Sequence, residues 1–263
     1  MTHRKPHKQS SQKDINNELE AHFKIIQSCS VKTDDGERIL LAARPESRYP
    51  YFYPRDAACA SGLLAYLSTS RLSIADDAYE LLKSIANFVL KIIGYDGYLG
   101  QRYALSGEEK SIYKQEDNNA HGWIILANYL ITAKSREEDI QDIDRLLLSI
   151  KNASQYAIKN YYRPEINLFH STTSIHESAL EEGFSCWTNF AYLKAFTLVS
   201  KVNDDLDAPD IIQDKILTFK SAFKHNLFSI MVANNRFLRR IDEKGNYDFK
   251  PDFTLLSPFY FGF

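Results

Sequence analysis

An aromatic run in the first quarter of the chain ends in two adjacent opposite charges, Arg55 and Asp56. Pro54 fixes its own φ and pushes Tyr53 toward an extended backbone, so we expect a loop that ends where Asp56 caps a helix starting at Ala57. Aromatic faces beside a guanidinium and a carboxylate suit a sugar, because its C–H faces stack on rings and its hydroxyls pair with the charged groups. The alternative is a helix cap with a surface ion pair and aromatic residues that belong to the core.

Two further polar stretches precede predicted helices and carry carboxylates. The first is Gln115-Glu116-Asp117, and the second contains Glu181 and Glu182. Taken alone, Asp117 before a helix is typical of capping, with the carboxylate placed favourably against the helix dipole. Adjacent carboxylates repel each other, so one of the pair Glu181 and Glu182 is held protonated if both are shielded from water. A protonated carboxyl group is what a general acid requires.

Composition excludes several classes of protein and site. The 263 residues are 44% apolar and 25% charged, with a formal net charge of −2, which indicates neither disorder nor a surface for nucleic acid. Cys29, Cys59 and Cys186 are too widely spaced for a zinc site or a disulfide framework. His170 and His176 lie in a polar loop without the partners of a metal site, so we expect no metal.

The first 14 residues are polar and basic and lack the apolar segment of a secretory signal, so we expect a disordered tail followed by one domain over residues 15–263. No apolar run is long enough to cross a bilayer. These features predict a cytoplasmic protein that does not interact with a membrane.

Helical periodicity recurs along the rest of the chain. The predicted helices span residues 15–28, 57–67, 76–94, 118–133, 140–160, 185–202 and 211–227, and an eighth begins after residue 252. Turn residues predict one small β-hairpin around Phe237 to Ile241. Short links and long polar loops alternate between the helices. The pattern predicts an all-α fold, a double ring of paired helices whose long loops gather at one face and carry the site.

Four motifs in order resemble glycoside hydrolase family 15, the glucoamylases. The string from Ile39 to Ala58 is similar to that family's opening, where an aromatic-Pro-Arg-Asp motif follows a short apolar strand. Gln115-x-Asp117 before a helix resembles its second motif. The third and fourth matches are Leu180-Glu181-Glu182-Gly183 with Trp187-Thr188, and Asp252-Phe253-Thr254-Leu255-Leu256. Together they cover most of the chain from about residue 36 onward.

This resemblance implies an (α/α)6 toroid and inverting exo-hydrolysis of α-linked glucosides, with an α-glucan or oligosaccharide as substrate and no cofactor. Arg55 and Asp56 would hold the glucose to be released, Glu181 would be the general acid, and Glu182 would bind the neighbouring sugar. Further substrate-binding positions implied by the motifs are Tyr53, Gln115, Asp117 and Trp187.

The chain departs from the family pattern in several places, among them Tyr53-Pro54 where the family has a tryptophan before Arg-Asp. Leu180 stands where the family has a tryptophan before the two acids, and Glu177 offers a rival position for the general acid. The family's catalytic base lies in later helices, and we count about eight of twelve helices here. We therefore expect a partial toroid, either a fragment or a truncated homologue.

Two other functions remain compatible with the sequence. One is a carbohydrate-binding or regulatory module that keeps the sugar grip at Arg55 and Asp56 without hydrolysis, and the other is a helical interaction scaffold. Glucose release from maltose or starch separates the enzyme from the module, and loss of sugar binding in an Arg55 variant separates the module from the scaffold.

Overall fold

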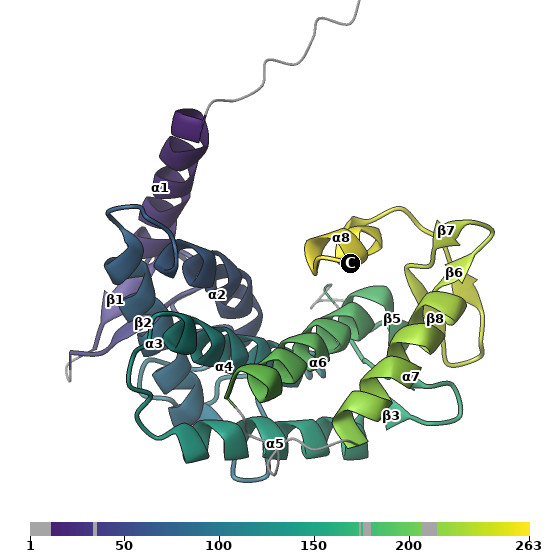
Figure 1. The fold of residues 1–263 in the computed structure, drawn as a ribbon. Helices are drawn as coiled ribbons and strands as arrows, with labels where there is room; N and C mark the ends of the chain where they lie inside the picture. The colour runs from purple at the N-terminus through teal and green to yellow at the C-terminus, as the bar shows by residue number, and fades with distance from the viewer. Residues whose placement is uncertain (1–11, 34–35, 174, 176–179, 207–214) are drawn as a thin grey trace, which may run out of the picture.

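The computed structural model describes residues 12–33, 36–173, 175, 180–206 and 215–263, and it is mainly helical (Figure 1). The helices are α1 (Gln12–Ser28), α2 (Pro54–Ser68), α3 (Ala75–Ile92), α4 (Asn118–Ser135), α5 (Ile143–Asn160), α6 (Cys186–Leu206), α7 (Lys215–Ile230), the 3-10 helix η1 (Phe253–Leu256) and α8 (Ser257–Tyr260). This arrangement confirms the predicted all-α class.

Helix α4 is the centre of the molecule because both of its flanks are covered. It packs against α2 on one side and α6 on the other, and its buried residues lie on every face. Trp123, Ile125 and Leu126 are adjacent or nearly adjacent in sequence, point in different directions and are all fully buried. A helix that is apolar all round belongs inside a fold, so α2, α4 and α6 form an inner layer.

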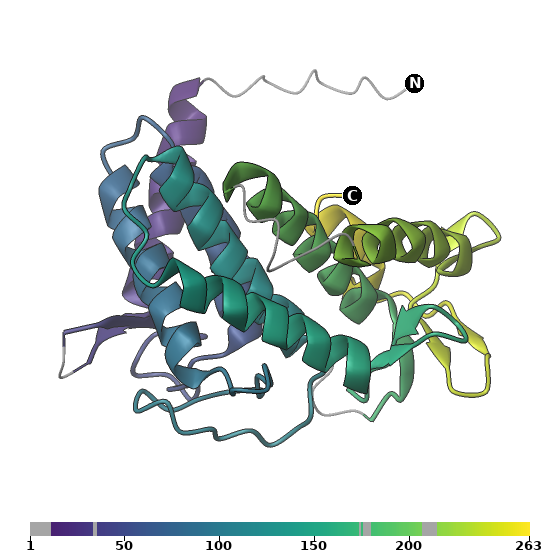
Figure 2. The same ribbon diagram turned by 60° about the horizontal axis from the view of Figure 1, so that its bottom comes forward.

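Helices α3, α5 and α7 form the outer layer. Helix α3 packs on α2 and α4, α5 packs on α4, and α7 packs on α6. In α3, Leu82, Ile85 and Val89 repeat at helical spacing and are buried, whereas Glu80 faces solvent. One apolar stripe is what a helix needs when it covers a core from outside. The outer helices follow an arc around the inner ones, and Figure 2 shows the same arrangement from below.

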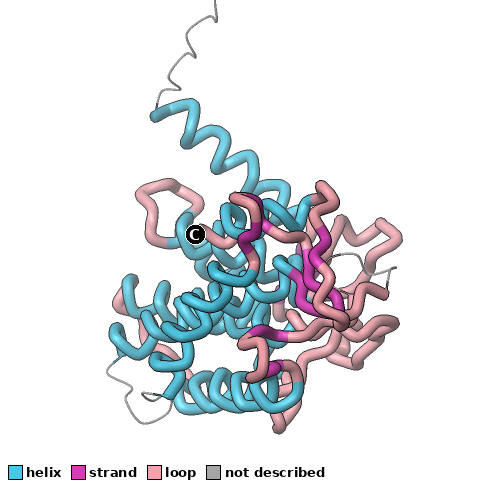
Figure 3. Tube along the Cα trace, turned by 90° about the vertical axis from the view of Figure 1, so that its right-hand side faces the viewer, coloured by secondary structure: helices cyan, strands magenta, loops and turns pink. Residues whose placement is uncertain are grey.

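Short strands join the helices, and most of them lie with the long loops on one side of the helical layers (Figure 3). The strands are β1 (Ser30–Lys32), β2 (Arg38–Leu40), β3 (Tyr162–Arg163), β4 (Leu168–Phe169), β5 (Gly183–Ser185), β6 (Val232–Ala233), β7 (Arg236–Phe237), β8 (Arg240–Asp242) and β9 (Tyr247–Asp248). All pairings are antiparallel: β1 with β2, β3 with β4, β6 with β7, and β8 with both β5 and β9.

The C-terminal turns form two hairpins in place of the single hairpin that was predicted. Asn234 and Asn235 have φ of +53° and +58° and join β6 to β7. Asparagine tolerates positive φ, and two such residues make the tight turn that suits a two-residue hairpin. The turn around Gly245 joins β8 to β9. The predicted strand was therefore divided between two separate ribbons.

The start of α2 differs from the prediction. The helix begins at Pro54, three residues before Ala57, and Tyr53 is its N-cap with φ −115° and ψ 119°. Proline suits the first helical position because its fixed φ is helical and its missing N–H would have no partner there. Asp56 consequently lies exposed in the first turn and is not the cap.

Two further boundaries are earlier or later than expected. Helix α1 begins at Gln12, so the last residues of the expected 14-residue tail are helical, and residues 1–11 lie outside the described part. Helix α5 begins at Ile143 and not at Ile140. None of the described helices combines the length and the apolar content that a bilayer crossing requires.

Candidate active site

Arg55 and Asp117 form a buried ion pair between two inner helices. The guanidinium Nη2 donates to both carboxylate oxygens, at 3.1 Å to Oδ1 and 2.9 Å to Oδ2. The Arg55 side chain is 11% exposed and that of Asp117 only 1%. Arg55 thus contacts a carboxylate 62 positions away in sequence.

Two more side chains hold the same carboxylate. Trp187 Nε1 donates to Asp117 Oδ2 at 3.0 Å, and His121 Nε2 lies 3.2 Å from that oxygen. Burial by itself raises the pKa of Asp117, but the Arg55 charge and the hydrogen bonds from His121 and Arg55 together hold it well below its usual value. Asp117 is therefore an anion with fixed orientation. We call Asp117, Arg55, His121 and Trp187 the Asp117 cluster.

The ends of the inner helices position this cluster. Arg55 is in the first turn of α2, Asp117 is the N-cap of α4, and Trp187 is in the first turn of α6. Asp117 makes no capping hydrogen bond, so its carboxylate is directed to the cluster and not to its own helix. It still lies at a helix N-terminus, where the dipole favours negative charge. Three helix ends from separate parts of the chain thus meet at one place.

Glu116 connects this place to the loop before α6. Its side chain is 1% exposed, and it accepts from Thr172 through the backbone N at 2.9 Å and through Oγ1 at 2.6 Å. Thr173 Oγ1 donates to the carbonyl of Lys114 at 2.8 Å. The sequence motif singled out Gln115 and Asp117 as substrate-binding positions. The residue between them, Glu116, anchors the neighbouring loop through Thr172.

Arg55 also reaches this loop. Its Nη1 donates to the carbonyl oxygen of Ile175 at 3.4 Å, and farther along the backbone N of Glu181 donates to Thr172 at 2.8 Å. Glu177, the rival candidate for the general acid, lies outside the described residues. The described residue Ile175, two positions before it, is in contact with the Asp117 cluster.

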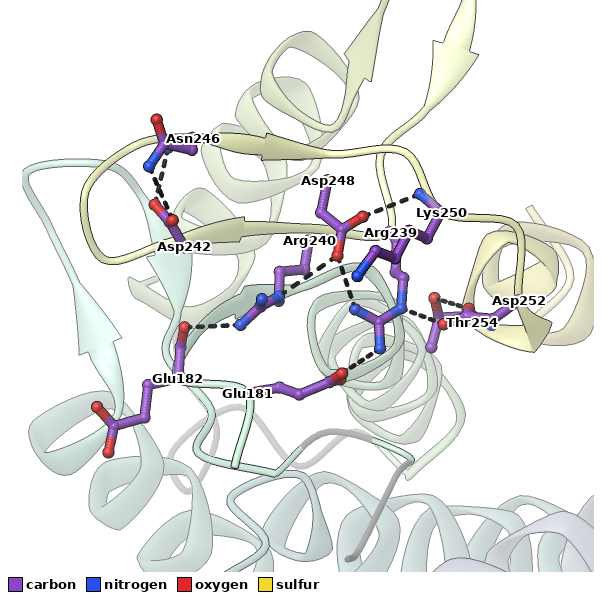
Figure 4. Close-up of polar contacts among 10 residues, drawn as sticks. All are labelled: Glu181, Glu182, Arg239, Arg240, Asp242, Asn246, Asp248, Lys250, Asp252 and Thr254. Atoms are coloured by element: carbon purple, nitrogen blue, oxygen red, sulfur yellow. Dashed lines mark hydrogen bonds and ion pairs between the residues drawn. The ribbon is translucent and has the colours of Figure 1, made fainter. Parts of the chain in front are cut away.

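Glu181, the preferred candidate, lies in a different cluster, which is built around Arg239 (Figure 4). Arg239 Nη2 donates to Glu181, Nη1 donates to Asp248 at 2.8 Å, and Nε donates to Asp252. Burial alone lowers the pKa of Arg239, and the carboxylates raise it above its ordinary value. We call Arg239, Glu181, Asp248 and Asp252 the Arg239 cluster. It ties the segment before β5 to β9 and η1.

Glu182 is turned away from Arg239. Its carbonyl oxygen accepts from Arg240 Nη1 at 3.2 Å, while its side chain is exposed and points outward in Figure 4. Glu181 and Glu182 therefore do not share one shielded site. The repulsion that the sequence suggested between these carboxylates is relieved by the opposite directions of their side chains.

The remaining predicted positions lie close to the helix ends. Tyr53 is 6% exposed, and its hydroxyl accepts from Arg102 Nη1 at 3.2 Å. Gln115 is buried, its Oε1 accepts from Asn118 at 3.3 Å, and its Nε2 has no hydrogen-bond partner in the described structure. The Trp187 ring packs on the C-terminal aromatics, with Phe261 at 4.9 Å between centroids.

Sequence reasoning missed His121 and Arg239. His121 follows Asp117 by four positions, which is the spacing of neighbours on one helix face, so this pair carried a usable signal. Arg239 meets Glu181 across 58 positions of sequence, and nothing in its local sequence indicates that contact. In the described part of the chain, no group of three or more His, Cys, Asp or Glu side chains is arranged to hold a metal.

No protein-family model matches the sequence, and no curated protein matches it. Solved structures do match. A wild-type glycosidase aligns with a TM-score of 0.61 and 16% identity over 92% of this chain and 63% of its own. A glucoamylase from Saccharomycopsis fibuligera aligns with a TM-score of 0.64 and 12% identity over 88% of this chain and 53% of its own. A sugar epimerase from a ruminal bacterium aligns with a TM-score of 0.64 and 13% identity over 89% of this chain and 59% of its own.

These similarities show the fold. The chain spans about 63% of the length of the glycosidase that it matches, and its described helices form part of an α/α toroid. The expectation of an incomplete ring of paired helices is thereby confirmed.

Proposed function

We propose that the Asp117 cluster binds a sugar and that the chain takes part in processing carbohydrates. The observation that carries this proposal is the meeting of a guanidinium, a carboxylate and an indole from the ends of α2, α4 and α6. Charged groups with fixed orientation suit hydroxyls, and ring faces suit the C–H surface of a hexose. The structural neighbours named glycosidase, glucoamylase and sugar epimerase support a carbohydrate substrate.

Within this class the proposed reaction is inverting exo-hydrolysis of α-linked glucosides. Arg55 and Asp56 hold the glucose to be released, with Tyr53, Gln115, Asp117 and Trp187 around it. A general acid protonates the leaving oxygen, and a second carboxylate about 6.5–9.5 Å away activates water.

Two residues, Glu181 and Glu177, are candidates for the general acid. Glu181 is held in an ion pair with Arg239, so its carboxylate reaches a leaving oxygen only after this pair separates. Glu177 follows Ile175, whose carbonyl is held by Arg55. This contact supports Glu177 as the acid and gives Glu181 the role of fixing the loop.

Glucose release from maltose and starch tests the proposal. We expect Glu177→Gln to reduce kcat by roughly 100-fold or more, as removal of a general acid does. Glu181→Gln should have a smaller effect that accompanies a change in stability. Glu80→Gln, on the exposed face of α3, is the matched control and should leave kcat unchanged. A large loss in Glu181→Gln alone would restore Glu181 as the acid.

The second candidate is a module that binds sugar without turnover, and the ion pair between Glu181 and Arg239 favours it. In this case maltose binds to the wild type, no glucose appears, and Arg55→Lys weakens binding because lysine lacks the planar fork of arginine. Maltose binding that is equal in wild type and Arg55→Lys, without turnover, would contradict both candidates. The cytoplasmic location expected from the sequence stays a prediction.

A further inference from the structure

A cavity of about 320 Å³ lies between α2, α4, α6 and the C-terminal segment, deeper along the inner helices than Asp117. Its polar lining comes from Cys59, His121, Asn128, Lys194 and Tyr260. No described residue that lines it carries a carboxylate. A volume of this size is at the lower end of the range for small-molecule sites. The cavity therefore differs in charge from a site in which paired carboxylates cleave a bond.

Lys194 gives this cavity a positive charge that the described residues do not neutralise. Its side chain comes from α6 and is half-buried, and its Nζ has no ion-pair or hydrogen-bond partner within the described part of the chain. Burial lowers the pKa of Lys194, because the ammonium group loses hydration and gains no anionic partner among the described residues. An ammonium group in such a position favours a ligand that brings its own negative charge.

His121 lines the same cavity and has one ring nitrogen that makes no hydrogen bond within the described structure. It is 1% exposed, and because Asp117 is ionised, its Nε2 carries the proton in their 3.2 Å hydrogen bond. Its Nδ1 has no partner among the described residues. Burial lowers the pKa of His121 more than Asp117 raises it, so the ring is neutral and Nδ1 keeps a lone pair.

The remaining lining fits the body of a sugar. Asn128 Nδ2 donates to Ser61 Oγ at 2.9 Å, so its carbonyl oxygen is the atom that remains for a ligand. Tyr260 and Phe261 place two aromatic rings on the C-terminal side. Aromatic rings pack on C–H faces, whereas the histidine and asparagine acceptors pair with hydroxyls.

We infer that this cavity binds a monosaccharide that carries an anionic group, either a carboxylate or a phosphate. Lys194 pairs with the anion, and His121 Nδ1 accepts from a ring hydroxyl. The sugar class rests on the proposed function, while the anionic class rests on the lining of the cavity. Because His121 holds Asp117, a ligand here also contacts the group that orients the Asp117 cluster.

Calorimetric titration of the full chain with glucuronate, glucose 6-phosphate, glucose and inorganic phosphate tests the inference. We expect one of the two anionic sugars to bind at least about tenfold more tightly than glucose, the gain of one charge-assisted hydrogen bond. Lys194→Met should remove this gain. Lys201→Met, at an exposed position of the same helix, should preserve it.

A second variant tests the role of the histidine. His121→Gln keeps a donor that can reach Asp117 and replaces the ring acceptor at Nδ1 with an amide oxygen in a different position, so we expect weaker binding of the anionic sugar and unchanged binding of inorganic phosphate. Equal affinities of wild type and Lys194→Met for both anionic sugars would overturn the inference. If inorganic phosphate binds as tightly as glucose 6-phosphate, the sugar contributes nothing to binding and the inference of a monosaccharide ligand is wrong. Failure to release glucose from maltose would overturn hydrolysis alone and leave the titration result unaffected.

Discussion

The Asp117 cluster and the Arg239 cluster are opposite solutions to the burial of charge. In the first, a single carboxylate accepts from Arg55, His121 and Trp187. In the second, a single guanidinium donates to carboxylates. The Asp117 side chain is 1% exposed, whereas the carboxylates around Arg239 are 16–18% exposed. Water can therefore replace a lost partner in the second cluster but not in the first.

This difference in exposure means that the side chains of the Asp117 cluster are held in one arrangement, whereas those of the Arg239 cluster can rearrange. Removing one partner of a fully buried ion pair leaves an uncompensated charge, which is more costly than the pair itself is favourable. A partly hydrated carboxylate that loses its partner turns to solvent at smaller cost. We therefore expect the Asp117 cluster to control global stability and the Arg239 cluster to control the position of the loop before α6.

The largest effect is expected for Asp117→Asn. The substitution keeps the shape of the side chain and removes its charge, so the buried guanidinium of Arg55 loses its ion pair with Asp117. The free energy of unfolding should fall by about 3–5 kcal/mol. Urea denaturation followed by circular dichroism measures this change.

Asp76→Asn is the control for this prediction. Asp76 pairs with Arg136 at 2.7 Å, but its side chain is 89% exposed, and exposed ion pairs contribute little. If the two variants have the same stability, the distinction between buried and hydrated clusters is wrong.

An intermediate effect is expected for Arg239→Met. Methionine keeps part of the buried volume and leaves Glu181, Asp248 and Asp252 without their shared partner. We expect the free energy of unfolding to fall by about 2 kcal/mol, less than for Asp117→Asn, because these carboxylates are partly hydrated. Hydrogen exchange should increase in β5, β8 and β9. Unchanged exchange in those strands would show that Arg239 does not hold the loop.

The smallest effect is expected in the pH dependence of stability. His121 has a folded-state pKa below its ordinary 6.5, so the unfolded chain binds a proton first as the pH falls, and stability decreases below about pH 6.5. The pKa of Asp117 is also lowered from 3.8, so its contribution is present at neutral pH and is lost at more acidic pH, below the range of the histidine.

The His121→Gln variant separates the pH range in which the histidine titrates from the more acidic range of Asp117. The variant lacks the histidine titration, so its unfolding free energy should change less between pH 6.5 and 5 than that of the wild type, while the loss in stronger acid persists. Melting temperatures measured across this range provide the test. Parallel curves for the two proteins would mean that the histidine is protonated in the folded state.

Local patterns in the sequence predicted the helices well because each helix carries its own apolar spacing. Outer helix α3 shows a single stripe of Leu82, Ile85 and Val89, and its predicted and observed ranges agree closely. The start of α2 was misplaced because an aspartate was taken as the cap when Pro54 already occupied the first helical position. Arg55, Asp117 and Trp187 were also singled out from the sequence, and the structure brings them into contact.

Contacts between distant segments were beyond the reach of the sequence. Glu181 and Glu182 were interpreted as a pair because they are adjacent, yet one contacts Arg239 and the other faces solvent. The partner that separates them enters through the pairing of β5 with β8, which depends on how α6 and α7 fold back. No periodicity in either segment encodes that register.

Gly183 in β5 has a consequence for the recognition of distant relatives. Its φ is +138°, and a Cβ atom there would lie 2.3 Å from the carbonyl oxygen of Ile241 on β8. Two backbones in such close approach leave no room for a side chain, and this constraint does not depend on which substrate a homologue binds. As homologues drift past the point where ordinary sequence comparison detects them, this glycine is a position that selection should retain, and it can serve as a fixed reference for aligning them.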